Sequence, residues 1–297
     1  MSKKKVKEME EMAAQANMSQ MGLIWHRFKK NKLAVIGLIA LCVLILVCFT
    51  SPIYLNYEKV ITQDLLNAYK SPSRDHILGT DMYGRDLLAR MLYGGIYSLG
   101  SGLIVVAAAL VLGVLFGSIA GYFGGKIDTI IMRFIDIFMA IPALLMTMTL
   151  VVVFGQSIYS LWLAMIITQF PGLARVVRAS IMTIRDSEYV DAARIYGAPV
   201  GKILIKHILP NGIGPVVVSA TMMLGSVILT IAGLGFLGIG IASPTPEWGT
   251  ILSEVKDYIR YYPYLGIIPG VAIGISVLCI NFVGDGIRDA LDPRTKK

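Results

Sequence analysis

The residue types that could engage another molecule gather in one short polar segment, residues 188–210, between long uncharged stretches. Ser187 can cap a helix, and Glu188 and Asp191 fall in its first turn, where the helix dipole favours anions. Gly197 suits the left-handed backbone that commonly follows a helix end. The segment therefore predicts a compact, capped helix that binds the surface of another molecule and does not catalyse a reaction.

One face of this predicted helix is apolar. Four residues spaced i, i+3, i+4 and i+7 share it: Tyr189, Ala192, Ala193 and Tyr196. The two alanines allow another backbone to approach closely, and the two rings can anchor in a groove of a partner. The face predicts docking onto another protein, although a loop helix folded back on its own chain explains the spacing equally well.

The same segment resembles the EAA loop of type I ABC importer permeases. The match rests on the Asp-Ala-Ala triplet 191–193, on Gly197 after three further residues, and on Leu-Pro at 209–210. Asp191 stands where glutamate is usual, which keeps the charge, and His207 stands where isoleucine is usual. In that family the loop is a coupling helix that docks into the ATP-binding subunit. The resemblance implies coupling roles for Glu188, Tyr189, Asp191, Ala192, Ala193, Arg194, Tyr196 and Gly197.

Two further strings resemble the C-type subunit of oligopeptide and dipeptide permeases. One is Leu-Gly-Thr-Asp-Met-Tyr-Gly-Arg-Asp at 78–86, and the other is Gly-Asp-Gly-Ile-Arg-Asp-Ala-Leu-Asp-Pro-Arg at 284–294. The Lys-His-Ile-Leu-Pro-Asn ending at 206–211 is similar to the peptide/nickel class. The strings occur in the family's order, so the resemblance covers nearly the whole chain from about residue 22. It implies import of short peptides, with nickel or a metallophore as the alternative cargo.

Residues for covalent or nucleotide chemistry form no recognisable arrangement. The nearest approaches to a phosphate-binding loop are 121–126 and 197–202, and neither has glycine, four residues, then Gly-Lys-Ser/Thr. The three histidines, His26, His76 and His207, lie in different segments, so a three-histidine metal site is not expected. The sequence predicts no enzyme, no metal and no cofactor in this chain, with ATP and Mg²⁺ on partner subunits.

The composition is that of a membrane protein. Of 297 residues, 56% are hydrophobic and 15% are charged, and the mean hydropathy is +0.69; about a quarter charged is usual for a soluble domain. A span needs about 20 apolar residues. The uncharged runs predict an all-α integral membrane protein with six transmembrane helices and the type I importer fold: 33–52, 97–119, 132–154, 158–178, 213–238 and 263–284.

Lysine and arginine set the orientation, because cytoplasmic segments carry an excess of them. Residues 1–32 have eight, 175–206 have six, and the C-terminal tail has four. The predicted outer loop at 58–90 has five, balanced by five acids. Both termini are therefore expected in the cytoplasm. The net charge of +8 is split across loops, which gives little support to a nucleic-acid partner.

These segments predict the order of the chain. It comprises a cytoplasmic tail (1–32), a first span (33–52), an extracytoplasmic loop with an interfacial helix (53–96), a five-helix permease core (97–284) that holds a cytoplasmic coupling loop (179–212), and a C-terminal tail (285–297). The N-terminal stretch is too polar, and the first apolar run too long, for a cleavable signal. Cys42, Cys48 and Cys279 lie in predicted spans, so no disulfide framework is expected.

Ionisable residues are scarce inside the spans. Asp136 lies near the cytoplasmic boundary with Arg133 one turn away, which favours a structural ion pair. A proton- or sodium-driven carrier would usually bury carboxylates or histidines near the midplane, and the sequence has none there. This counts against the rival of a stand-alone secondary transporter or channel, and a non-transporting scaffold is a further rival.

Small and polar residues suggest two uses for the spans. Gly113, Gly117, Gly121 and Gly125 repeat every four residues, which predicts a close seam within the bundle or with a second permease subunit. A translocation path is expected beside Gln169, Ser219, Met222, Met223 and Ser226, since methionines adapt to varied shapes and hydroxyls offer hydrogen bonds. The alternatives are that glycine is simply common in membrane helices and, for the second set, ordinary helix packing.

The resemblance also implies a complete assembly. It comprises a homologous second permease subunit, two ATP-binding subunits and an extracytoplasmic solute-binding protein, placed in the bacterial cytoplasmic membrane.

Overall fold

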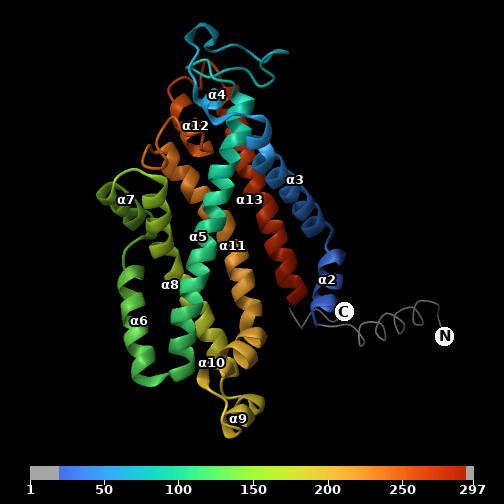
Figure 1. The fold of residues 1–297 in the computed structure, drawn as a ribbon, viewed down its shortest axis with the longest axis vertical. Coiled ribbons are helices and arrows are strands. Elements are labelled where there is room, and N and C mark those ends of the chain that lie inside the picture. Colours follow the sequence, from blue (N-terminus) through green and yellow to red (C-terminus); the bar gives the residue numbers. More distant parts are fainter. Residues whose placement is uncertain (1–19, 292–297) are drawn as a thin grey trace, which may run out of the picture.

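The computed structural model describes residues 20–291. These residues fold into a tall bundle of helices and form no β-sheet (Figure 1). Five helical stretches are long and apolar enough to cross a membrane: α3 (Lys32–Tyr54), α5 (Leu87–Phe123), α8 (Ile158–Ile184), the stretch Val200–Phe236 that contains α11 (Leu209–Phe236), and α13 (Tyr264–Leu291). A sixth crossing is made if the bent pair α6 (Gly125–Met139) and α7 (Ala143–Phe154) counts as one. The expected all-helical, multi-span fold class is confirmed.

The third crossing differs in shape from the single helix predicted over 132–154. α6 and α7 meet at an angle of 81°. Pro142 lies at the break, directly before the first residue of α7. A proline disfavours helical backbone in the residue before it, here Ile141, so the chain turns instead of continuing. The predicted third span is therefore built from two helices instead of one.

The second crossing is longer than expected. The interfacial helix that was predicted to end before residue 97 and the predicted span after it form one continuous helix, α5. Asp86 precedes α5, and its Oδ1 accepts a hydrogen bond from the backbone N–H of Ala89 at 2.8 Å, which caps the helix. α5 then continues for 37 residues. At about 1.5 Å per residue it is about 55 Å long, well beyond the ~30 Å hydrocarbon core of a bilayer. It therefore reaches into both ends of the molecule.

Three of the four seam glycines lie where α5 meets α8. A Cβ atom added at Gly117 would lie 2.5 Å from the carbonyl oxygen of Ala174. One added at Gly121 would lie 2.9 Å from the carbonyl oxygen of Arg178, and one at Gly113 would lie 2.7 Å from an α8 side chain. A larger residue would force the two backbones apart.

Gly125 takes no part in this seam, which corrects the prediction. It is the first residue of α6, its φ is +53°, and an added Cβ would meet nothing within 4 Å. The four-residue repeat follows one face of α5 and ends with that helix at Phe123, so the spacing cannot carry over into the next helix.

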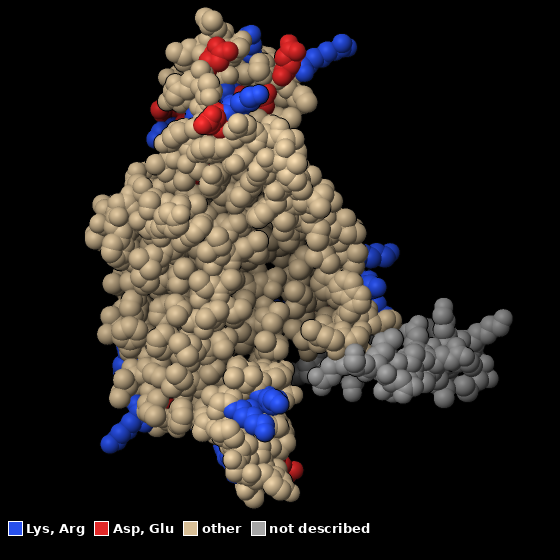
Figure 2. Space-filling model, viewed as in Figure 1, with Lys and Arg blue, Asp and Glu red and all other residues tan. Residues whose placement is uncertain are grey.

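The middle of the bundle is an apolar core that α5, α8 and α11 share. Its buried members include Val105, Ala109, Leu161, Leu173, Val227 and Leu234. Figure 2 shows the matching surface: charged atoms gather toward the top and bottom of the visible face and project at its right edge, and an uncharged area lies between them. This distribution fits a protein whose middle lies in a bilayer.

The two ends of the bundle are built differently. At one end the cap, defined as residues 55–86 and 239–263, contains α4 (Tyr57–Ile61), the turn η1 (Leu65–Asn67) and α12 (Trp248–Val255). At the other end the coupling loop contains α9 (Glu188–Ile195), α10 (Val200–Ile203) and the π turn η2 (Leu204–Ile208). α2 (Gln20–Lys30) lies in the predicted N-terminal tail, and α13 extends into the predicted C-terminal tail; residues 1–19 and 292–297 lie outside the described part.

Candidate functional site

The coupling loop opens with a tight turn between α8 and α9. Ser187 occupies the N-cap position of α9, but its hydroxyl donates to the carbonyl oxygen of Ile184 at 2.7 Å and makes no capping bond to α9. The predicted side-chain cap is therefore wrong. At the other end of α9, Gly197 has a φ of +74°, and the backbone N–H of Ala198 donates to the carbonyl oxygen of Ala193 at 3.1 Å. This backbone pattern closes the helix.

One fully buried side chain, Val190, fixes α9 to the bundle. It packs into a small core with buried residues of α8, α10, η2 and α11: Val177, Ile181, Ile203, Ile208 and Val216. Ala193, three residues further on, is partly buried against the same core. Sequence reasoning missed Val190, although its spacing from Ala193 was the available signal.

The opposite side of α9 is open. Its exposed residues are Glu188, Tyr189, Asp191, Ala192, Arg194, Ile195 and Tyr196. The exposed fraction is 85% for Ile195 and 90% for Tyr196. The predicted four-residue face is thus divided, because Ala193 turns toward the core and away from solvent. The outward face keeps both rings and Ala192, and it gains Ile195, which sequence reasoning overlooked.

Two arginines tie the coupling loop to the end of α5. The guanidinium of Arg194 lies over the ring of Tyr122, 5.4 Å from its centroid, and pairs with Asp191 at 2.8 Å. The contact with Tyr122 and the pair with Asp191 hold the pKa of Arg194 above its ordinary value, so the group stays charged. Arg185 Nη1 donates to the carbonyl oxygen of Gly121 at 3.1 Å. A movement of α9 would therefore be transmitted directly to α5.

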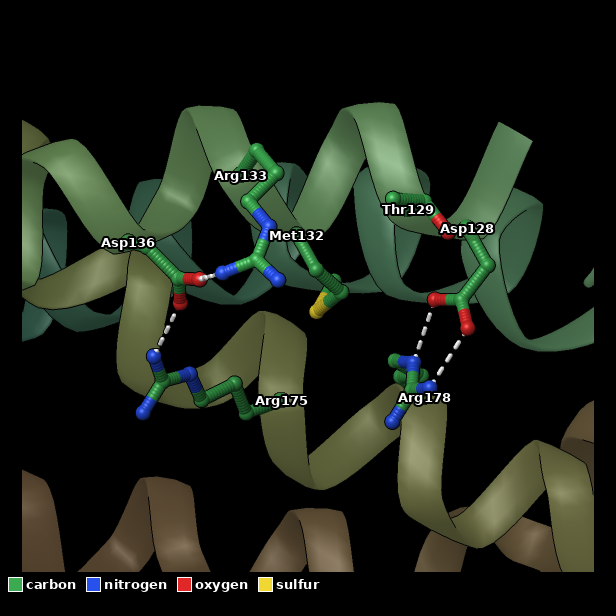
Figure 3. Close-up of a pocket in the computed structure, with 7 residues that line it drawn as sticks. All are labelled: Asp128, Thr129, Met132, Arg133, Asp136, Arg175 and Arg178. Atoms are coloured by element: carbon green, nitrogen blue, oxygen red, sulfur yellow. Dashed lines mark hydrogen bonds and ion pairs between the residues drawn. The ribbon is translucent and has the colours of Figure 1, made fainter. Parts of the chain in front are cut away.

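A charged groove of about 380 Å³ lies between α6 and α8. Figure 3 shows two α6 carboxylates, Asp128 and Asp136, pointing toward α8. Both oxygens of Asp128 accept hydrogen bonds from Arg178. Asp136 accepts from Arg175 at 2.5 Å and from Arg133 at 3.4 Å, so the predicted pair is present but is the longer of the two. These contacts fasten α6 to α8, and α8 leads directly into the coupling loop.

The candidate path residues come from two helices. Ser219, Met222, Met223 and Ser226 lie along α11, and Gln169 lies on α8. Met223 packs against the central core, whereas Met222 is 39% exposed. The hydroxyl of Ser226 donates to the carbonyl oxygen of Met223 at 2.8 Å, within its own helix. Met223 is partly buried against the core, and all five residues remain candidates.

The cap holds a buried ion cluster that sequence reasoning missed. Arg85 and Arg90 reach Asp81 at 2.7 and 2.6 Å. They also reach Glu254 of α12 at 2.7 and 2.6 Å. The two arginine side chains are 0% exposed. The cluster joins the loop before α5, the first turn of α5 and α12, and no spacing rule could find it, because Glu254 lies 164 residues from Arg90 in the sequence.

A second buried carboxylate, Glu247, caps α12 within the cap. Its Oε2 accepts from the backbone N–H of Thr250 at 2.8 Å, and its Oε1 accepts from the hydroxyl of Ser98 at 2.9 Å. The indole N–H of Trp248 donates to the carbonyl oxygen of Met91 at 2.9 Å. Burial raises the pKa of Glu247, while the backbone N–H groups at the start of α12 act in the opposite direction.

Two protein-family models match separate parts of the chain. The family described as binding-protein-dependent transport system inner membrane component matches residues 113–297, more than half of the chain and all of the coupling loop. The chain belongs to this family. A second model, the N-terminal TM domain of oligopeptide transport permease C, matches residues 19–72 of this inner membrane component.

Named relatives of this inner membrane component are peptide permeases. The chain is 40% identical to the dipeptide transport system permease protein DppC of Alkalihalophilus pseudofirmus over 272 residues, which are 92% of this chain and 89% of that protein. It is also 40% identical to the oligopeptide transport system permease protein OppC of Bacillus subtilis over 271 residues, 91% of this chain and 88% of that protein. The resemblance to C-type permease subunits is confirmed.

A solved structure shares the fold of this inner membrane component. It is titled inward facing conformations of the MetNI methionine ABC transporter, with a TM-score of 0.57 and 22% identity, and the match covers 69% of this chain and 97% of that chain. At this identity the likeness shows the fold alone. Fold and family together make the protein a multi-pass permease subunit of a bacterial ABC importer.

Proposed function

We propose that this permease subunit forms half of a translocation path for short peptides, driven by ATP that separate subunits hydrolyse. The cargo is supported by the names of the relatives, which are dipeptide and oligopeptide permeases. The working assembly contains a homologous second permease subunit, two ATP-binding subunits that hold ATP and Mg²⁺, and an extracytoplasmic solute-binding protein. We expect no catalytic site in this chain, because its sequence lacks a phosphate-binding loop.

The outward face of α9 is the observation that carries this proposal. Ile195 and Tyr196 are almost fully exposed on a helix whose inner side is fixed by the buried Val190. Large apolar side chains that face solvent on a helix fixed to the rest of the protein mark an interaction site. Aromatic side chains often contribute most of the binding energy at such sites. A groove on an ATP-binding subunit would cover this face in the helix-in-groove manner.

A displacement of α9 can reach the membrane crossings, because the coupling loop is fastened to several of them. Arg194 and Arg185 hold it to α5, and Val190 holds it to the core beneath α8 and α11. The glycine seam then joins α5 to α8 with little room for sliding. ATP binding would shift the subunit between its states only to the extent that the closed ATPase pair prefers one of them.

The test is Ala192→Trp in the complete transporter. The new ring would stand in the middle of the outward face and away from the inner core. We expect uptake of a labelled dipeptide to fall and the yield of co-purified ATP-binding subunits to drop about tenfold, the change that 1.4 kcal/mol of binding energy gives. Ala242→Trp, at an exposed alanine of the cap, is the matched control and should keep its ATP-binding subunits.

Two outcomes would change the proposal in different ways. Wild-type uptake by Ala192→Trp with its ATP-binding subunits still bound would mean that α9 is not the coupling helix. Uptake of labelled nickel in place of the dipeptide, abolished by the same variant, would retain the coupling role and replace the cargo.

A further inference from the structure

Importer function leaves one face of α2 unexplained. Asn31 separates α2 from α3, and its Oδ1 accepts from the backbone N–H of Ala34 at 3.2 Å, so α3 starts as a helix of its own. The inner side of α2 is fixed by Phe28, which is 5% exposed. A Cβ atom added at Gly286 of α13 would lie 2.9 Å from the Phe28 ring, so the two helices are in close contact.

The outer side of α2 carries large apolar groups and a cation. Met21, Trp25 and Lys29 are spaced four residues apart and lie along one side of the helix. Met21 is 77% exposed and Trp25 is 50% exposed. The ammonium group of Lys29 lies 5.0 Å from the centroid of the Trp25 ring. Two such side chains beyond the end of a membrane crossing would stand in water unless something covers them.

The charge at this place is positive. α2 contains no acidic residue, and its last turn holds Arg27, Lys29 and Lys30. The exposed Lys32 follows as the first residue of α3, and the exposed apolar Leu33 comes next. Figure 2 shows basic atoms projecting at the edge of the molecule where α2 meets α3 in Figure 1.

Acidic groups also lie near this junction, on α13. Asp285 and Asp289 line a cavity of about 370 Å³ together with Arg288, Asn31 and Leu33. Asp289 accepts a hydrogen bond from the side-chain amide of Asn31 at 3.2 Å. These carboxylates belong to the cavity beside α13, and Arg288 shares it with them.

We propose that the face formed by Met21, Trp25 and Lys29, together with Lys32, binds the headgroups of anionic phospholipids in the cytoplasmic leaflet. Tryptophan prefers the level of the headgroups, and lysines beside a span are attracted to anionic lipid. An amphipathic helix of this kind lies with its apolar residues in the interface. A lipid surface fits better than a second subunit, because this face continues into the exposed apolar side of α3, which begins with Leu33.

The test uses the purified full chain in vesicles of phosphatidylcholine that contain phosphatidylglycerol. Bromine atoms on one lipid at a time quench nearby tryptophan, and the difference between wild type and Trp25→Phe isolates the signal of Trp25. We expect brominated phosphatidylglycerol to quench Trp25 more than its share of the lipid predicts, and we expect added salt to remove the excess. Lys29→Glu with Lys32→Glu should lower the preference about fivefold for each lysine removed.

Lys256→Glu, an exposed lysine of the cap, is the matched control and should keep the preference. Equal quenching by the two brominated lipids at low salt, or a preference that survives both α2 substitutions, would overturn the proposal. Absence of quenching by either lipid would also overturn it, and would assign the face to a protein partner. The measurement uses neither ATP nor cargo, so its failure would leave the importer function standing.

Discussion

The cap and the coupling loop are the two polar ends of one bundle, and they use polar and apolar groups in opposite ways. In the buried cluster of the cap, Arg85 and Arg90 are withdrawn from solvent, and each pairs with the carboxylates of Asp81 and Glu254. In the coupling loop, the Asp191–Arg194 pair stays on the surface, and Tyr196 points away from the protein. The cap hides its charges, while the loop displays its apolar side chains.

This difference indicates which end is complete. Buried charges are tolerated when they are paired, and both carboxylates that pair with Arg85 and Arg90 come from this chain. An exposed apolar face gains stability only when something covers it, and the ATP-binding subunit proposed above would cover that of the coupling loop. Substitutions in the cap should therefore act on folding, and substitutions in the loop should act on assembly and transport.

The largest effect is expected from Glu254→Ala in the cap. Removing this carboxylate leaves two buried guanidinium groups with one acid between them, which should lower the free energy of unfolding by about 3–5 kcal/mol. Thermal unfolding of the detergent-purified chain measures the loss. Asp191→Ala, in the exposed pair of the loop, is the comparison and should cost only about 0.5 kcal/mol. Equal losses for the two variants would erase the distinction between the ends.

A smaller effect on stability, with a large effect on transport, is expected from Gly197→Val. The φ of +74° at this position strains a β-branched residue by about 1–3 kcal/mol. The end of α9 should shift and misplace Tyr196, while the cap unfolds at its usual temperature. Gly201→Val is the matched control, since Gly201 has no positive φ and, like Gly197, has open space at its Cβ. If both variants transport equally well, the backbone of Gly197 does not position the docking face.

The smallest expected effect concerns the pH dependence of the cap. Because burial raises the pKa of Glu247, the folded state holds this proton more tightly than the unfolded state does. Its contribution to stability is therefore present at low pH and declines as the pH rises from the ordinary glutamate value to the raised one. Unfolding temperatures of wild type and Glu247→Gln across this range should show a decline in wild type alone. Parallel curves would mean that the pKa of Glu247 is the same in the folded and unfolded states.

Local patterns in the sequence account for the features that local residues determine. Asp86 caps a helix start and Gly197 adopts a positive φ, because both depend on a few neighbours in the chain. Pro142 was an available signal for the break between α6 and α7. It was not used, because the surrounding residues form one long uncharged run that was interpreted as a single span.

Features that depend on contacts between segments far apart in the chain could not be predicted from residue spacing. Ala193 turns inward because α8 and η2 build a core beneath it, and helical spacing alone cannot say which side of a helix faces the bundle. The partner of Arg90 in the cap, Glu254, comes from a helix far along the chain. Residue spacing could single out the segment that we propose as the docking site, but the outward part of its face required the tertiary structure.

Because α5 is one unbroken helix, it fixes the rotation of one end of the protein relative to the other about the helix axis. Arg90 in the cap cluster and Tyr122 beneath Arg194 lie 32 residues apart on this one helix. That distance is about nine turns, so the two side chains leave the helix on nearly the same side. Inserting or deleting a single residue between them would rotate one end by about 100° against the other. The number of residues in α5 is thus as much a part of the coupling as their identity, and changes in length are better tolerated in the loops than along this helix.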